Sequence, residues 1–409
     1  MYNWDFYEDL PEFHPITDAN NLYDGFQAVR KGSGWKLEVQ RMRWNLSHVL
    51  LQLQKELIAL QYNLPGAYEL QPYSLFELCE RGVARPITAL RGRDRVVKHV
   101  LNDLYLVPHV RQHLIYDNGA SLKNRGVDFA RRRIIAHLES YYREYGTNKG
   151  WIRLSDFSGF YDNIDHDLAY ELICKWEPDA LARKLTKQAY DSYSVDVSYM
   201  TDEEYERAKD EKFRMLDYRH AGHTSETRRK KLLHKSLSVG DPTSQITAIA
   251  YTTPIDLLMT AVHGQKYYEK YMDDTALISH DLEELQLLGE IFDREARKYK
   301  LFLNPRKTRI CRIDRTFTFL QFRYRLTKNG HVVVRIGRKT VTTIRRRLKK
   351  LAKKIREDGK DPRRAEELFR SWIGSYKKVM SKRQIRNMVT LYCDLFGGGL
   401  DQWLKMCIK

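Results

Sequence analysis

The stretch KYYEKYMDDTALIS, residues 266–279, places two adjacent carboxylates, Asp273 and Asp274, between two runs of strand-like composition. Neighbouring like charges repel, and a buried carboxylate loses its hydration, so a cation is expected close by if the pair lies inside the fold. Aspartates are also common at exposed turns. The stretch therefore predicts a hairpin whose tip is either an ordinary polar turn or a site for divalent metal ions.

The net charge of the chain points to a polyanionic partner. Its 409 residues include 71 lysines and arginines against 53 acidic residues, which gives a formal net charge of +18. Cationic side chains that replace the counterions of phosphates favour binding to nucleic acid. A basic surface that is merely solvated is the alternative. The hydrophobic content of 42% is sufficient for one large domain or two to three ordinary ones.

Cysteine content and the N-terminal residues bear on the compartment. Five scattered cysteines with no CxxC pair argue against a disulfide framework or a zinc site and for a reducing environment. The beginning, MYNWDFYEDLPEF, carries early acids and no apolar run, so no signal peptide is expected. No stretch is apolar over the length of a bilayer span. We expect a cytoplasmic protein that has no membrane partner.

The expected elements alternate between helices and short strands. Apolar residues recur at helical spacing over residues 36–62, which predicts one long amphipathic helix, and further helices are expected over 126–146 and 281–300. Residues 68–90 mix aromatic, β-branched and proline residues, as short strands and turns do. The highly charged residues 199–232 are expected to form an exposed insertion. This order predicts an α+β fold, with a sheet that carries helices on one face.

A third carboxylate is expected to join the pair at the hairpin. In GWIRLSDFSGFYDNIDH, residues 150–166, a short strand ends at Asp156 and a helix begins near Asp165. If that strand and the hairpin are neighbours in one sheet, three carboxylates converge. Divalent cations would neutralise such a cluster, and Mg²⁺ favours carboxylates together with substrate phosphates. Two ions held in this way suit phosphoryl transfer, so a basic chain with this cluster is a candidate nucleic-acid phosphoryl transferase.

The motif Tyr271-Met272-Asp273-Asp274 resembles the YxDD signature of reverse transcriptases. Other blocks in the order of that family follow along roughly residues 75–330, and RLSDFSGFYDNIDH resembles its first palm motif. The resemblance implies a right-hand polymerase with fingers, a palm built on an antiparallel sheet and a helical, basic thumb. It also implies two Mg²⁺ ions, with Mn²⁺ suited to the same ligands, held by Asp156, the Phe157 backbone, Asp273 and Asp274.

The resemblance further implies residues that contact the incoming nucleotide. Tyr161 matches the aromatic position under the sugar, although a core aromatic is the alternative. RPITALRGRDRVV, residues 85–97, resembles the fingers segment and makes Arg85 the strongest triphosphate contact, since a guanidinium binds phosphate in a bidentate manner. Arg81 is a weaker candidate for the same role. Arg91 and Arg95 are equally compatible with solvated or ion-paired side chains.

Two further motifs complete the resemblance to the family's catalytic core. LNPRKTRI, residues 303–310, resembles the motif whose lysine protonates the leaving pyrophosphate, and it points to Lys307. FTFLQFRY, residues 317–324, resembles the primer grip, with Gln321 where the family more often has glycine. That departure leaves the geometry of the turn open.

One block departs from the commonest pattern of the family. Many relatives read PQG followed by SP, whereas SVGDPTSQ here places Val239 before Gly240 and Gln245 after Ser244. Gly240 and Gln245 are the nucleotide-site candidates of this block. The pattern resembles the prokaryotic branch that contains enzymes of diversity-generating retroelements and several defence-associated reverse transcriptases. An apolar residue in place of the glutamine is expected to lower fidelity, because discrimination depends on contacts in the transition state.

The resemblance divides the chain into four parts. Residues 1–70 form an N-terminal helical extension, 71–150 the fingers, 151–335 the palm and 336–409 a helical thumb. The basic thumb is expected to track the backbone of a duplex through lysine and arginine contacts.

The expected activity is RNA-directed DNA polymerisation, a nucleotidyl transfer that adds dNTPs to a primer or to a protein hydroxyl. Its partners would be a template RNA, the DNA product and dNTPs, with a homo-oligomer or an accessory protein left open. The expected role is antiviral defence, with a dedicated noncoding RNA as template. An error-prone enzyme of a diversity-generating retroelement is one alternative, and a catalytically silent RNA-binding scaffold is another.

Overall fold

The computed structural model describes residues 14–80, 83–215, 231–359, 361 and 363–397. The chain divides into two compact units. The first contains Met1–Ala130, Ser155–Thr275 and Gln286–Thr308, and the second contains Arg131–Leu154, Ala276–Leu285 and Arg309–Lys409. Among the described residues, no helix is long and apolar enough to cross a membrane.

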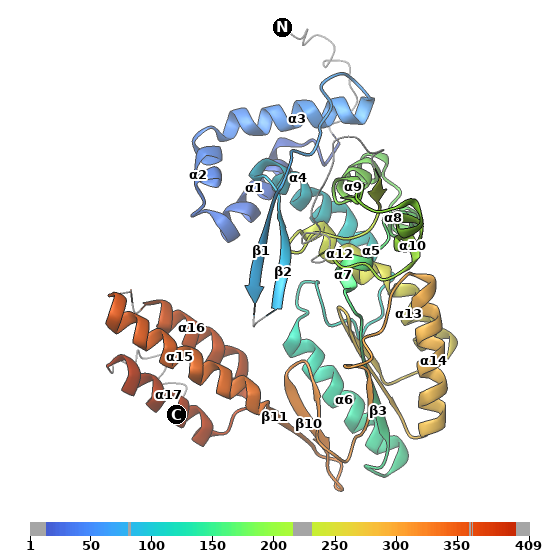
Figure 1. Ribbon diagram of the computed structural model, residues 1–409, viewed down its shortest axis with the longest axis vertical. Helices are drawn as coiled ribbons and strands as arrows, with labels where there is room; N and C mark the ends of the chain where they lie inside the picture. The colour runs from blue at the N-terminus through green and yellow to red at the C-terminus, as the bar shows by residue number, and fades with distance from the viewer. Residues whose placement is uncertain (1–13, 81–82, 216–230, 360, 362, 398–409) are drawn as a thin grey trace. The chain divides into compact units, whose positions relative to one another are not determined.

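The N-terminal part of the first unit is helical (Figure 1). It consists of α1 (Ala19–Ser33), α2 (Leu37–Trp44) and α3 (Leu46–Tyr62). The prediction of one helix over residues 36–62 is wrong, because Asn45 adopts φ −115° and ψ 33° and separates α2 from α3. Asparagine tolerates this break since its short amide competes with helical hydrogen bonds of the backbone.

The residues after this helical region form a long hairpin and then return to helix. Strands β1 (Ser74–Glu80) and β2 (Val83–Ala89) pair antiparallel, with Leu78 opposite Arg85. The following elements are α4 (Gly92–Leu101), the π-helix η2 (Asn102–Leu106), α5 (Val107–Arg111) and α6 (Val127–Tyr145). The predicted strands in 68–90 and the predicted helix over 126–146 are confirmed.

A layer of helices forms the remainder of the first unit's core. These are α7 (Phe160–Asn163), α8 (His166–Trp176), α9 (Ala180–Ser192), α12 (Pro242–Tyr251), α13 (Thr253–Leu257) and η3 (Leu258–Val262). Ile173 of α8, Leu185 of α9 and Ile249 of α12 are buried in one apolar cluster with Val97 and Val100 of α4. Burial of these side chains joins the expected palm helices to the helix that follows the hairpin.

A short two-stranded ribbon flanks the charged segment, residues 199–232. Strand β4 (Val195–Asp196) pairs with β5 (Leu232–Leu233), and α10 (Asp202–Asp210) lies between them in sequence. Thr201 and Glu204 form a reciprocal capping box at the start of α10, which satisfies donors that the helix itself leaves unpaired. The stretch predicted to be an exposed insertion therefore contains a defined helix.

The central sheet has the strand order β6-β7-β3-β8. Its strands are β6 (Tyr268–Tyr271), β7 (Asp274–Ser279), β3 (Trp151–Asp156) and β8 (Arg309–Arg312), and α14 (Leu282–Lys298) follows β7. The division between the two units passes through β3 and β7. Two predictions are confirmed: residues 266–279 form a hairpin, and its second strand is the neighbour of the strand that ends at Asp156.

A three-stranded antiparallel sheet belongs to the second unit. It contains β9 (Phe317–Phe319), β10 (Phe322–Leu326) and β11 (Val332–Ile336), in the order β11-β10-β9. Leu320 and Gln321 alone connect β9 to β10, and both have positive φ, at 46° and 71°. The turn thus has left-handed backbone where glycine is favoured. The Gln321 side chain accepts a hydrogen bond from the Tyr376 hydroxyl at 2.9 Å.

The C-terminal helices of the second unit share an apolar core of their own. They are α15 (Arg338–Asp358), α16 (Arg363–Tyr376), the 3-10 helix η4 (Lys377–Val379) and α17 (Lys382–Phe396). Ile344 and Leu348 of α15 pack with Phe369 and Ile373 of α16. The lysines and arginines of α15 occupy the remaining surface of that helix and are exposed.

A buried histidine begins α8. Asp165 caps the helix by accepting from the backbone N–H groups of Asp167 and Leu168. The next residue, His166, is fully buried and its Nε2–H donates to the Ser236 carbonyl at 2.6 Å. Nδ1 of His166 has no hydrogen-bond partner among the described residues. Burial lowers the pKa of His166 to about 4, although the Ser236 carbonyl opposes this shift.

We predict that His166 makes the stability of the protein depend on pH. Between its ordinary pKa of 6.5 and about 4, the unfolded chain takes up a proton at this position that the folded chain excludes. The free energy of unfolding should therefore fall by about 3 kcal/mol as pH decreases through that range. Urea unfolding at several pH values measures this, with His166→Gln as the control. A difference between wild type and variant that is constant with pH would contradict the prediction.

Candidate active site

The two hairpin aspartates lie at a turn that is anchored on its outer edge. Met272, between β6 and the aspartates, has a left-handed backbone with φ 54°. The segment before α6 pairs with β6, since the Gly119 N–H donates to the Lys270 carbonyl at 2.7 Å and the Lys270 N–H donates to the Asp117 carbonyl at 3.1 Å. These bonds fix the backbone that leads into the turn, so Asp273 has a defined position.

Asp156 is fixed by the segment that contains the lysine motif. It is 5% exposed at the end of β3, and its carbonyl accepts from the Asn304 N–H at 2.7 Å. Phe157 forms an isolated antiparallel bridge with Leu303. Lys307 of the same segment donates from Nζ to Asp156 Oδ1 at 2.7 Å. Residues 303–307 therefore hold both the backbone and the charge of Asp156.

The side chains predicted to form the site, three carboxylates and two cations, influence one another's charge. Burial and the Asp156 carboxylate raise the pKa of Asp273, while Lys307 and Arg85 oppose this rise. Partial burial acts to lower the pKa of Lys307, but Asp156, Asp273 and Asp274 together raise it above its usual value. The structure thus brings these five residues into one electrostatic neighbourhood, all of it within the first unit.

Tyr161 lies at the border between this neighbourhood and the glycine-containing loop. Burial and the charges of Asp273 and Asp241 raise the pKa of its phenol, which keeps the hydroxyl protonated. Its carbonyl accepts from the Leu237 N–H at 3.0 Å. Ser238 donates from Oγ to the Thr88 carbonyl of β2 at 3.1 Å. These two bonds place the loop before α12 against both α7 and the β1–β2 hairpin.

The two nucleotide-site candidates of this block, Gly240 in the loop and Gln245 on α12, differ in placement. Gly240 has φ +99°, a conformation that disfavours side chains with a Cβ, and it is exposed. Val239 is half-buried beside it. Gln245 lies on α12 with an exposed side chain, and no hydrogen bond joins it to the carboxylates among the residues that the structure describes. The structure therefore supplies no contact that would assign Gln245 to the site.

The arginine candidates other than Arg85 are either outside the described residues or bonded within the fold. Arg81 lies outside the described residues. Arg91 donates to the Pro72 carbonyl at 3.3 Å, and Arg95 donates to Ser33 Oγ at 2.8 Å. Burial lowers the pKa of Arg95. Both side chains thus support the local fold of the helical region, whereas Arg85 interacts electrostatically with Asp273.

A buried ion pair supports the loop at Gly240. Lys98 of α4 lies 3.1 Å from Asp241 Oδ2, and each residue is 3% exposed. Asp241 also accepts hydrogen bonds from the hydroxyls of Tyr193 and Thr243 and caps α12 through the Thr243 N–H at 3.1 Å. Although burial alone would raise the pKa of Asp241, Lys98 and these donors hold it below its usual value.

A second buried pair lies behind the hairpin. Lys270 of β6 is 1% exposed and is 2.8 Å from Asp256 Oδ2 of α13. Tyr268 donates to the other oxygen of Asp256 at 2.7 Å. Neither ion pair is predicted by the sequence patterns described above. Asp241 was detectable as a helix cap before proline in VGDPT, but no local signal identifies Lys98 or Lys270 as buried.

The negative charge of the carboxylates suits a divalent cation, but these side chains do not form a complete set of metal ligands by themselves. No group of three or more His, Cys, Asp or Glu side chains in the described part of the chain is arranged to hold a metal ion. Burial and the charge of Asp156 raise the pKa of Asp273, which makes ionisation of Asp273 more costly, and Lys307 donates a hydrogen bond to one oxygen of Asp156. Mg²⁺ is commonly held by one or two carboxylates plus phosphates, so this donor set fits an ion that arrives with a nucleotide.

Comparison with known proteins identifies the family. A family model described as reverse transcriptase (RNA-dependent DNA polymerase) matches residues 80–324, which is more than half of the chain. The chain belongs to the reverse transcriptase family. The predicted α+β fold class, with the right-hand polymerase architecture of this family, is thereby confirmed.

The other comparisons add a structural likeness. Among solved structures, telomerase from Candida albicans in complex with a fragment of telomeric RNA is similar, with 10% sequence identity and a TM-score of 0.43. The alignment covers 87% of this chain and 64% of the telomerase chain. No curated protein sequence matches this member of the reverse transcriptase family.

We predict that removing Lys98 strongly destabilises the first unit. Lys98→Met leaves the Asp241 carboxylate buried without its cation, which should lower the free energy of unfolding by about 3 to 5 kcal/mol. Lys98→Met combined with Asp241→Asn should recover part of this loss. Urea unfolding tests both, with Lys175→Met as the control because Lys175 is in an exposed pair with Glu171. Equal losses for Lys98→Met and Lys175→Met would refute the prediction.

Proposed function

We propose that this protein is an RNA-directed DNA polymerase that adds deoxynucleotides to a primer on an RNA template. The observation that carries the proposal is the grouping of Asp156, Asp273 and Asp274 around Lys307 in a member of this family. Divalent ions at Asp156 and Asp273, Mg²⁺ or Mn²⁺, would promote attack by the primer hydroxyl and stabilise the leaving pyrophosphate. Asp274 and the Phe157 backbone are the further ligands that we propose.

The proposed roles of the remaining residues follow from their placement. Lys307 is protonated beside the carboxylates, so its ammonium can donate a proton to the leaving pyrophosphate. Arg85 is a permanent cation near Asp273 and is positioned to bind the triphosphate. Tyr161 supports the sugar from below, and the exposed backbone of Gly240 allows the nucleotide to approach the loop.

We assign the parts of the chain accordingly. Residues 71–150 act as the fingers, 151–335 as the palm and 336–409 as the thumb, while residues 1–70 form an extension. Helices α1 to α3 lie before the matched residues 80–324. These helices and α10 are therefore candidates for binding a dedicated RNA or a second protein.

Loss of the carboxylates should abolish synthesis without abolishing RNA binding. Asp156→Asn, or Asp273→Asn with Asp274→Asn, should slow primer extension by about 10³-fold or more, because several kcal/mol of transition-state stabilisation are lost. Primer extension and RNA binding are measured side by side, with Asp293→Asn as a control at an exposed ion pair. If function in cells persists in the carboxylate variants, the scaffold alternative is correct.

The biological role that we favour is antiviral defence with a dedicated noncoding RNA. The ordered helix α10 within the charged segment and the helices before the family match support a function beyond copying. The alternative is an error-prone enzyme of a diversity-generating retroelement.

Sequencing of the DNA that accumulates with wild type, but not with Asp273→Ala/Asp274→Ala, distinguishes these roles. We expect uniform or repetitive DNA copied from one short RNA. DNA copied from a repeat, with errors concentrated at one template base, would instead identify a diversity-generating enzyme.

A further inference from the structure

One face of the three-stranded sheet carries arginines where the other carries apolar side chains. Along β10, Phe322, Tyr324 and Leu326 are buried, whereas Arg323 is half-buried and Arg325 is exposed. The neighbouring strand β11 adds the exposed Arg335. Because side chains alternate along a strand, this pattern separates a packed face from a cationic face.

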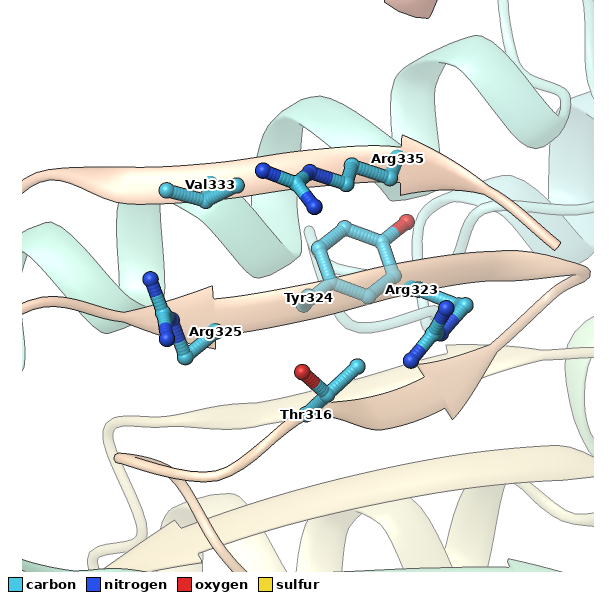
Figure 2. Close-up of a pocket in the computed structure, with 6 residues that line it drawn as sticks. All are labelled: Thr316, Arg323, Tyr324, Arg325, Val333 and Arg335. Carbon is cyan, nitrogen blue, oxygen red and sulfur yellow. The ribbon is translucent and has the colours of Figure 1, made fainter.

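The cationic face is hollowed. A cavity of about 170 Å³ is lined by Thr316, Arg323, Tyr324, Arg325, Val333 and Arg335. Figure 2 shows arginines from the two paired strands β10 and β11 around this hollow, with Thr316 on the segment that precedes β9. No carboxylate is among the lining residues, all of which belong to the second unit.

The arginines of this hollow repel one another without compensation. Arg323 and Arg335 are directly opposite in the antiparallel register of β10 and β11. Like charges at such positions destabilise a sheet. Within the described part of the chain, none of the three arginine side chains forms an ion pair or a hydrogen bond, whereas Arg312 of β8 pairs with Asp314 at 2.6 Å. The charge at the hollow is thus available to an external anion.

The arrangement suits successive phosphates rather than a single small anion. Arg323 and Arg325 are two residues apart along the strand, about 6.7 Å, which is comparable to the separation of adjacent phosphates in a nucleic-acid strand. Guanidinium groups bind phosphate oxygens in a bidentate manner. Tyr324, the one aromatic residue of the lining, is fully buried, so no ring is exposed there for stacking on bases. These features favour contact with the backbone.

We propose that Arg323, Arg325 and Arg335 form a binding site for the phosphate backbone of a nucleic-acid strand. The site is sequence-independent, because it offers cations and no group that reads a base edge. None of the three carboxylates Asp156, Asp273 and Asp274 lines it, since they belong to the first unit. The site holds the strand whether or not synthesis takes place.

The salt dependence of RNA binding tests this site. For single strands, the slope of log Kobs against log salt changes by about 0.7 for each neutralised phosphate. Replacing Arg323, Arg325 and Arg335 by Gln should therefore make the slope of binding to a mixed-sequence RNA oligonucleotide shallower by about 2. The same three positions replaced by Lys should keep the wild-type slope, because charge is retained. Thermal unfolding of each variant verifies that the sheet is intact.

A matched control separates this site from a general loss of charge. Arg294→Gln/Arg297→Gln/Lys298→Gln on α14 changes the net charge equally, but Arg297 and Lys298 are already paired with Asp293 and Glu295. Its slope should equal that of wild type. An equal change in the control, or an unchanged slope in the Gln variant, overturns the proposal. A Gln variant that loses affinity for inorganic phosphate but keeps the wild-type slope for RNA also overturns the proposal.

RNA binding is measured without metal ions, so that it does not depend on synthesis, and primer extension is measured separately with Mg²⁺ and with intact carboxylates. A shallower binding slope in the Gln variant, together with no primer extension by the wild-type protein, would support the arginine site and contradict the polymerase proposal. Primer extension with an unchanged slope would do the reverse.

Discussion

The arrangement of this protein depends on three carboxylates held close together against their mutual repulsion. The backbone hydrogen bonds of β3 and of the β6–β7 hairpin fix Asp156, Asp273 and Asp274, so the acids cannot separate to relieve that repulsion. Lys307 supplies the counter-charge from a side chain that is 63% exposed. An ion pair of this exposure contributes little stability, so the ammonium can leave Asp156 at low cost when another cation arrives. Fixed acids and a displaceable lysine suit the transient metal binding that we propose for this site.

The rigidity around these acids comes from buried ion pairs. Lys98 with Asp241 fixes the loop at Gly240, and Lys270 with Asp256 fixes the strand that leads to the YMDD turn. Desolvation of both partners makes such pairs poor sources of stability, whereas the loss of one partner is costly. We interpret both pairs as interactions that select one conformation for the loop at Gly240 and for the YMDD turn. Any other conformation of either segment would leave a buried charge without its partner.

The two units use positive charge differently. In the first unit, Lys98 and Lys270 are buried and satisfied by internal partners. In the second unit, the cations of α15, Arg325 and Arg335 are exposed and Arg323 is half-buried, and the side chains of Arg323, Arg325 and Arg335 have no partner among the described residues. Part of the net charge of +18 is therefore accessible to phosphates. Accessible positive charge favours binding to nucleic acid and makes that binding sensitive to salt.

Local patterns in the sequence were sufficient for the elements that carry the acids. The strand-like runs on both sides of Asp273 and Asp274 predict the hairpin, and the residues around Asp165 predict the start of α8, because each signal lies within a few residues of its effect. The same kind of pattern was misleading at Asn45, where apolar spacing continues across a break in the helix.

Only the tertiary structure decided which charges meet. Lys98 and Asp241 are 143 residues apart, and the opposition of Arg323 and Arg335 depends on the register of two strands. The left-handed turn at Leu320 and Gln321 likewise follows from the pairing of β9 with β10. Sequence patterns report the preferences of neighbouring residues, whereas the energy of a charge depends on partners and burial that exist only after the chain has folded.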